Sequence, residues 1–349
     1  MKSIIKSMLS NSLWHYIAIK RRLPWGPYKH MSSRDRNSFA SMLSIWRPSN
    51  ALPVILLEWN MTRWCNYKCS YCNQPHQRFA RNGKYTAHAF DNFPLEDWLS
   101  AFARHFEKRR LALLISGGEP MMDKKNMLPL LQELTALPTV EYINISTNAS
   151  WNPKMYEGID LSKITLLLSY HPTQIAQESF FNRLDELLEF GFKIGMVNFV
   201  MSKDNFAQYS DFKTKIAKKG VPLHASPQWQ LRGKYSKEEL SILKQELPEM
   251  DYLYRTGVVS TFGKKCLFPA VSYQMDQTGH ISVSCHPQVT GRFFEHSLPS
   301  VFAGPVSCPH ISCGCLHKYS LLKGSNRDTN VNILQIYSNI LKQKQGITS

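Results

Sequence analysis

Residues 65–72 read CNYKCSYC, so that Cys65, Cys69 and Cys72 lie close together and no fourth cysteine follows nearby. A disulfide uses two cysteines, and a structural zinc site usually closes with four ligands. Three thiolates on one loop leave one coordination position of a metal or of an iron–sulfur cluster open to a small molecule. A Cys3His zinc site is the alternative, because His76 lies close enough in the sequence to complete it.

The elements that must position this loop follow from the hydrophobic pattern, which alternates from residue 54 between strand-like and helical periods. Six strands joined by helical crossovers predict an α/β fold, a partial (β/α)6 TIM-like barrel, with a flavodoxin-like open sheet as the alternative. In both folds chemistry gathers at the C-terminal ends of the strands, and CNYKCSYC directly follows the first one. We predict strands over 54–62, 111–120, 142–148, 163–172, 193–201 and 221–228, and helices over 94–110, 124–137, 174–191 and 205–220.

The β/α rhythm stops after residue 230. There the pattern predicts a helix over 236–247, a hairpin over 264–288 with its turn at 276–279, and a helix over 330–345. We therefore expect four units, which are a basic N-terminal arm (1–50), a core barrel (51–230), a small cysteine-rich extension (231–325) and a C-terminal helix (326–349).

Composition limits the class of protein. The 349 residues are 43% hydrophobic and 12% aromatic, which is ample for a sizeable core. The eight cysteines are clustered in a chain without an export signal or an apolar run long enough to span a membrane. Such clustering favours metal binding over disulfides and predicts a cytoplasmic protein.

The net charge of +16 is concentrated at the start of the chain, since residues 1–50 carry nine Lys or Arg against one acid, Asp35. Such an arm suits an anionic partner, either a phosphate-bearing substrate or an anionic membrane surface, or it serves only as a solvated face. Nucleic acid is not expected as a partner, because no aromatic-basic RNA motif accompanies the charge.

CNYKCSYC closely resembles the cysteine signature of the radical S-adenosylmethionine (radical SAM) superfamily. The resemblance implies that Cys65, Cys69 and Cys72 hold a [4Fe-4S] cluster and that SAM chelates its fourth iron. It further implies that an electron from a flavodoxin- or ferredoxin-type reductant cleaves SAM to a 5′-deoxyadenosyl radical, which abstracts hydrogen from an unreactive C–H bond. The cofactors then supply the chemistry, and the protein positions the reacting groups and excludes water.

Further motifs fall in the order of that family. GGEP at 117–120 (Gly117, Gly118, Glu119, Pro120) resembles the motif that handles the SAM amino group. By the same resemblance, Ser146, Asn148 and Ser169 contact the SAM carboxylate or ribose and Tyr71 meets the adenine. The chain departs from many peptide-modifying relatives after Ser169, where it reads Tyr-His-Pro instead of Asp-Gly, so His171 is a further candidate site residue.

Five cysteines follow late in the chain, and their spacing resembles the twitch or truncated SPASM extension of some radical SAM enzymes. The resemblance implies one auxiliary [4Fe-4S] cluster, and the fifth thiol is then spare or a hydrogen-atom donor. Zinc is the alternative, with His286, His310 and His317 as ligands. The expected cluster ligands are Cys266 and Cys285 together with two of Cys308, Cys313 and Cys315.

The function implied is a radical SAM oxidoreductase that oxidises or dehydrogenates a small phosphate-bearing or sugar-type substrate. A peptide maturase that cross-links or epimerises is the alternative, although the segment before the first strand is short for a leader-binding module. A non-enzymatic iron–sulfur carrier or regulatory protein that binds SAM is the second alternative.

Overall fold

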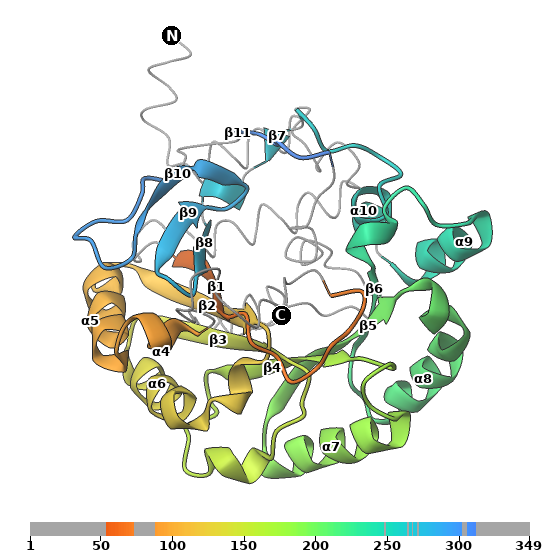
Figure 1. Cartoon of the computed structure of the whole chain (residues 1–349), viewed down its shortest axis with the longest axis horizontal. Coiled ribbons are helices and arrows are strands. Elements are labelled where there is room, and N and C mark those ends of the chain that lie inside the picture. Colours follow the sequence, from red (N-terminus) through yellow and green to blue (C-terminus); the bar gives the residue numbers. More distant parts are fainter. Residues whose placement is uncertain are drawn as a thin grey trace, which may run out of the picture.

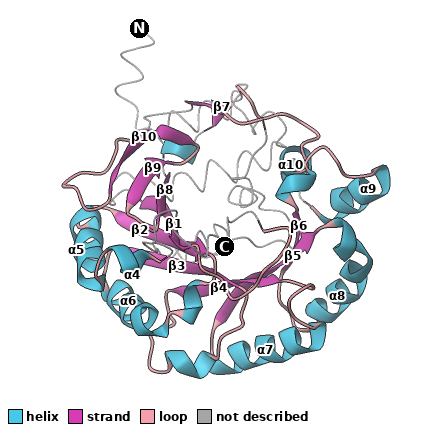
Figure 2. Cartoon of the chain, in the orientation of Figure 1, coloured by secondary structure: helices cyan, strands magenta, loops and turns pink. Residues whose placement is uncertain are grey.

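The protein has a curved central sheet with helices along its outer side, as the computed structural model shows (Figures 1 and 2). The expected basic arm (1–50) and C-terminal helix (326–349) lie outside the described residues, as do Cys313 and Cys315. The described residues are 54–72, 88–247, 249–263, 265–266, 268–270, 272–301 and 306–311.

The six predicted strands lie side by side in the order in which they occur along the chain. Each neighbouring pair among them is parallel. A flavodoxin-like sheet would place its second strand outside the first, so this order confirms the partial TIM-like barrel. The strands are β1 (Val54–Thr62), β2 (Arg110–Gly117), β3 (Val140–Thr147), β4 (Ile164–Tyr170), β5 (Lys193–Met201) and β6 (Leu223–Pro227).

Helices fill the crossovers and cover the convex side of the sheet (Figure 1). The helix that follows β4 ends as predicted at Gly191, whose φ of 101° lets its N–H bond back to the last turn. The sequence did not predict the two short helices α4 and α10. The helices are α4 (Ala89–Asn92), α5 (Leu95–Phe106), α6 (Lys124–Ala136), α7 (Gln177–Phe190), α8 (Phe206–Lys218), α9 (Lys237–Glu246) and α10 (Glu249–Arg255).

The predicted hairpin beyond residue 230 joins the same sheet. β8 (Ser272–Asp276) turns at the expected place into the antiparallel β9 (His280–Val283), and β10 (His286–Arg292) follows. Unexpectedly, β8 pairs in parallel with β1, so the sheet order is β10-β9-β8-β1-β2-β3-β4-β5-β6. The hairpin thereby satisfies the backbone groups along one edge of the barrel strands. Among the described strands, β10 and β6 end the sheet, which stays open.

Aromatic packing fastens the hairpin segment to α5. Phe293 is fully buried, and its ring lies 4.8 Å from that of Phe102 and 5.9 Å from that of Trp98. His105 Nε2 lies 2.6 Å from the Phe293 carbonyl oxygen. The segment after β10 therefore shares the core of the barrel.

A second, two-stranded sheet joins β7 (Lys265–Cys266) and β11 (Val306–Ser307) in antiparallel fashion, with Val306 opposite Cys266. Cys308 directly follows β11, so the backbone of Cys308 lies near the backbone of Cys266 in space although the two are distant in the sequence.

None of the helices among the described residues is long and apolar enough to cross a membrane.

Candidate active site

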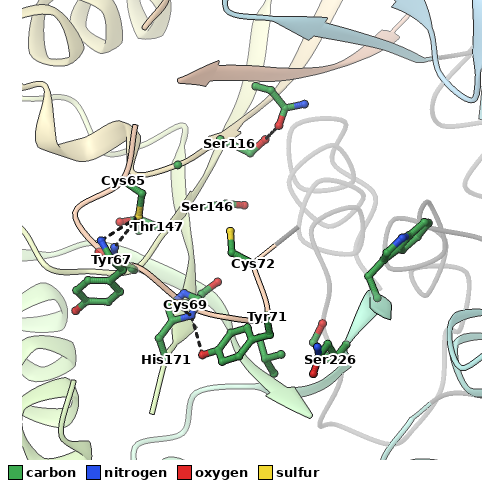
Figure 3. Close-up of a pocket in the computed structure, with 18 of the residues that line it drawn as sticks. Cys65, Tyr67, Cys69, Tyr71, Cys72, Ser116, Ser146, Thr147, His171 and Ser226 are labelled. Atoms are coloured by element: carbon green, nitrogen blue, oxygen red, sulfur yellow. Dashed lines mark hydrogen bonds between the residues drawn. The ribbon is translucent and has the colours of Figure 1, made fainter. Parts of the chain in front are cut away.

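A cavity of about 410 Å³ lies at the C-terminal ends of the barrel strands. Cys65, Cys69 and Cys72, from the loop that follows β1, all line it (Figure 3). Ser116, Ser146 and Ser169 line it from the second-last positions of β2, β3 and β4. The candidate site residues therefore lie at the carboxyl ends of the parallel strands, where folds of this kind place their active sites.

Two glycines hold the base of the cysteine loop. Gly118 N–H donates to the Thr62 carbonyl over 2.7 Å, and the next N–H, of Glu119, donates to the Trp64 carbonyl over 2.8 Å. A Cβ atom on Gly118 would lie 1.8 Å from the Trp64 oxygen, and one on Gly117, whose φ is 133°, would lie 2.2 Å from the Thr62 oxygen. Only glycine allows this approach of two backbones, so the pair is needed to seat the cysteine loop.

The Glu119 side chain braces the end of β3. Its carboxylate accepts hydrogen bonds from Thr147 Oγ1 at 2.7 Å, Asn148 N at 2.6 Å and Met121 N at 3.1 Å. The side chain is almost fully buried, and burial raises the pKa of Glu119 to about 7 although the hydrogen bonds oppose the shift. Glu119 is thus a buried anchor between the β2 and β3 ends.

Beside the contacts from the β2 end, further contacts hold the cysteine loop from the β3 and β4 sides. Asn148 Nδ2 donates to Asn66 Oδ1 over 3.0 Å, and Asn66 Nδ2 donates to Ser150 Oγ over 2.9 Å. From the β4 side, Gln174 Oε1 accepts the Lys68 N–H over 2.8 Å. The loop is therefore ordered by the ends of β2, β3 and β4 together.

His171 stands beside the central cysteine. Its Nδ1 atom lies 3.3 Å from Cys69 Sγ and 3.2 Å from the Tyr71 hydroxyl, and its ring is stacked with that of Tyr71 (Figure 3). Burial lowers the pKa of His171 to about 4, so the ring is neutral near pH 7. Burial also raises the pKa of Tyr71, which keeps its phenol protonated.

The donor set of the loop fits an iron–sulfur cluster. The three thiols line one cavity, and the Tyr67 N–H lies 3.4 Å from Cys65 Sγ, which is the kind of backbone contact that stabilises thiolate ligands. Burial raises the pKa of the Cys65 thiol and that of Cys69, the latter to about 11, so metal binding must release their protons.

The residues expected to contact SAM divide into two groups. Six line the cavity, whereas Glu119 and Pro120 lie buried behind it, Glu119 in its bonds to the β3 end and Pro120 at the start of a 3-10 turn. The six are Tyr71, Gly117, Gly118, Ser146, Asn148 and Ser169.

Three of the five late cysteines belong to the residues that the structure describes. Cys285 and Cys308 are both half-buried, and Cys285 has a φ of 62° in the turn after β9. Cys266 lies in β7, and the side chains of Cys313 and Cys315 belong to residues that are not described. Among the described residues, no three His, Cys, Asp or Glu side chains are grouped to hold a metal ion, and this includes Cys65, Cys69 and Cys72, which line one cavity without being gathered about one point.

Sequence reasoning missed several charged residues of the cavity. Glu58 lines it from β1, and Arg63 lines it from the loop that follows. Arg232 and Arg255 line it from beyond β6. Arg63 could have been found from its place just past a strand end. Arg232 and Arg255 carried no such signal, because the predicted core barrel ended at residue 230.

Comparison with known families bears on the segment that carries the cysteines. A model described as the radical SAM superfamily covers the chain from Trp59 in β1 to Tyr170 at the end of β4. Residues 59–170 match the radical SAM superfamily. The matched segment contains the cysteine loop, the GGEP turn and Ser169, and it supplies most of the residues that line the cavity.

The individual proteins named next are identical to this chain at 25% or fewer of the aligned residues. GTP 3′,8-cyclase of Pasteurella multocida (strain Pm70) is 25% identical over 179 residues, which are 48% of this chain and 51% of the relative. The chain thus aligns with about half the length of that curated relative. Solved structures with similarity are native anSMEcpe with bound AdoMet (TM-score 0.49, 13% identity, 80% of this chain and 83% of that one) and BtrN in complex with AdoMet and 2-DOIA (TM-score 0.31, 17% identity, 85% and 91%).

Proposed function

We propose that the protein is a radical SAM oxidoreductase that acts on a small phosphate-bearing or sugar-type substrate. The observation that carries this proposal is that Cys65, Cys69 and Cys72 all line one cavity together with the strand-end residues. The superfamily match over residues 59–170 supports it. A cavity of about 410 Å³ is of the size that small-molecule sites have.

In this proposal the three cysteines hold a [4Fe-4S] cluster and SAM fills the adjoining space. When bound, the cluster and SAM supply an adenosyl radical that removes a hydrogen atom from an unreactive C–H bond. The chain positions the partners: Gly117 and Gly118 allow the close backbone contact that holds the cysteine loop, and the serines at the ends of β2, β3 and β4 offer hydroxyl groups to the ligand. Tyr71 and His171 wall the site with neutral rings.

A second cluster in the extension completes the proposal, and the chemistry that it supplies is acceptance of the electron released when the substrate is oxidised. The pairing of β7 with β11 supports it, since it brings the Cys266 and Cys308 backbones together. Cys285 and one of Cys313 and Cys315 would complete the four ligands.

The test is anaerobic reconstitution of the wild type and of a Cys65→Ala/Cys69→Ala/Cys72→Ala variant. After reduction with dithionite, the wild type is expected to convert SAM to 5′-deoxyadenosine and the variant is not. Iron and sulfide are measured on both, with circular dichroism to show that the variant folds. About four irons retained by the variant would show the second cluster, and none retained would remove the electron-accepting site from the proposal. A wild type that binds iron and SAM but forms no 5′-deoxyadenosine, with candidate substrates present, would favour a carrier or regulatory protein.

A further inference from the structure

The cavity has a side that the first five strands and the cysteine loop do not form. It is formed by the end of β6 and the segment that follows, and Ser226 marks it in Figure 3 beyond Tyr71. Gln230 Nε2 donates to the Tyr71 carbonyl over 3.3 Å, which ties this segment to the cysteine loop. Two arginines line the cavity from this region, Arg232 in the segment after β6 and Arg255 at the end of α10.

Arg255 is held in a defined orientation. Its NH2 donates to Ser226 Oγ over 2.9 Å, and its NH1 lies 3.1 Å from His224 Nε2. A guanidinium only donates, so Nε2 accepts and the hydrogen of the His224 ring is on Nδ1. Nδ1 lies 3.1 Å from Asn198 Oδ1, which accepts that hydrogen. This chain of contacts from β5 through β6 orients the guanidinium before any ligand arrives.

The other arginine is positioned by an aromatic ring. The Arg232 guanidinium lies over the Trp229 ring in a cation–π contact, and both residues line the cavity. An arginine held in place by a ring loses less entropy when it binds an oxyanion.

The charge of the cavity points to an anionic ligand. Its lining holds three arginines, the third being Arg63, and one carboxylate, Glu58, which accepts a hydrogen bond from Gln274. SAM carries a net positive charge and a single carboxylate, so it does not account for two oriented arginines on the β6 side. Planar guanidinium groups bind phosphate oxygens in pairs of parallel hydrogen bonds.

We propose that Arg255 and Arg232 form a subsite for a phosphoryl group of the substrate, oriented by His224 and Trp229. The inference rests on the proposed function, because it names the substrate class of the same cavity. It assigns phosphate recognition to residues beyond the matched segment, on the side of the cavity that adjoins α10.

The test uses inorganic pyrophosphate as the probe, titrated calorimetrically into the full-length reconstituted protein with and without saturating SAM. Arg255→Gln and Arg232→Gln are expected to weaken pyrophosphate binding about tenfold or more, with SAM affinity within about twofold of wild type. Arg183→Gln is the matched control, since Arg183 on α7 pairs with Glu186 and is outside the cavity lining. Its pyrophosphate binding is expected to equal that of wild type.

His224→Gln keeps an acceptor for Arg255 and a donor for Asn198, so it is expected to bind pyrophosphate nearly as wild type does, whereas His224→Leu is expected to weaken it. The Gln variant preserves the hydrogen bonds and the Leu variant removes them. The difference in pyrophosphate binding between the two variants therefore tests the orienting role of His224.

Several results would overturn the subsite. Arg255→Gln could lose SAM affinity and keep pyrophosphate affinity, in which case the arginine serves the SAM carboxylate. Malonate could bind as tightly as pyrophosphate and show the same arginine dependence, which would assign the subsite to carboxylates. Absence of pyrophosphate binding to the wild type at millimolar concentration would also overturn it.

The two proposals fail separately. A preparation that cleaves SAM but shows no arginine-dependent pyrophosphate binding overturns the subsite and leaves the radical SAM function. A preparation that binds pyrophosphate through both arginines but never cleaves SAM keeps the subsite and overturns the proposed enzyme.

Discussion

His171 Nδ1 lies 3.3 Å from the Sγ atom of Cys69, the central cysteine of the loop. With its hydrogen on Nδ1, the ring donates to that sulfur. Hydrogen bonds to ligand sulfurs stabilise the more negative, reduced state of a cluster and raise its potential.

We therefore expect His171→Phe to lower the midpoint potential of the reconstituted cluster by roughly 50 mV, the equivalent of one hydrogen bond in a one-electron step. The measurement is an EPR-monitored redox titration without SAM. Gln174→Ala is the matched control, because Gln174 bonds the Lys68 N–H of the same loop and no sulfur. A potential unchanged in the histidine variant would show that the contact has no electronic role.

Gly118 seats the cysteine loop, so Gly118→Ala is expected to reduce iron incorporation sharply. The added Cβ would lie 1.8 Å from the Trp64 oxygen, and the backbone that carries Cys65 must move to relieve the clash. Iron per chain after reconstitution is the measurement. Gly220→Ala is the control, with a φ of 67° but nothing within 4 Å of the new Cβ. It is expected to cost about 1 kcal/mol of stability and to keep its iron.

The pKa of Glu119, raised to about 7 by burial, makes stability depend on pH. The folded state binds the proton more tightly than the unfolded state, in which a glutamate titrates near its ordinary value of 4.5. The stabilisation is therefore complete below pH 4.5 and is lost as the pH rises through 7.

Urea unfolding of the metal-free protein between pH 5 and pH 8 should show this dependence. Relative to Glu119→Gln, the wild type is expected to lose up to about 3 kcal/mol over that range. The exposed Glu157→Gln variant is the control and should follow the wild-type curve. Parallel curves for wild type and Glu119→Gln would contradict the raised pKa.

Phe293 fastens the hairpin segment to α5, so Phe293→Ala is expected to cost roughly 3–5 kcal/mol of unfolding free energy. The ring is fully buried against Phe102 and Trp98. Phe262, which is 67% exposed, supplies the control, and its alanine variant should unfold like wild type. Similar thermal transitions for both variants would contradict this role of the Phe293 ring.

Much of the barrel could be predicted from local pattern. The bounds predicted for the first and fifth strands agree with β1 and β5, and α6 differs from its prediction by one residue. These elements are long and strongly periodic, so hydrophobic spacing alone identifies them. α10 was missed because its seven residues are too few for a periodic signal.

Sequence by itself determined the prediction of a cluster site at one end of the cavity. Three cysteines after a strand, followed by GGEP after the next strand, indicate a cluster site because parallel strand ends must meet at one face. The pairing of β8 with β1, the inward burial of Glu119 and the arrival of Arg255 from α10 depended on the tertiary structure. Each joins segments that are distant along the chain, and no local spacing encodes which distant backbone or side chain will fill a given edge or cavity.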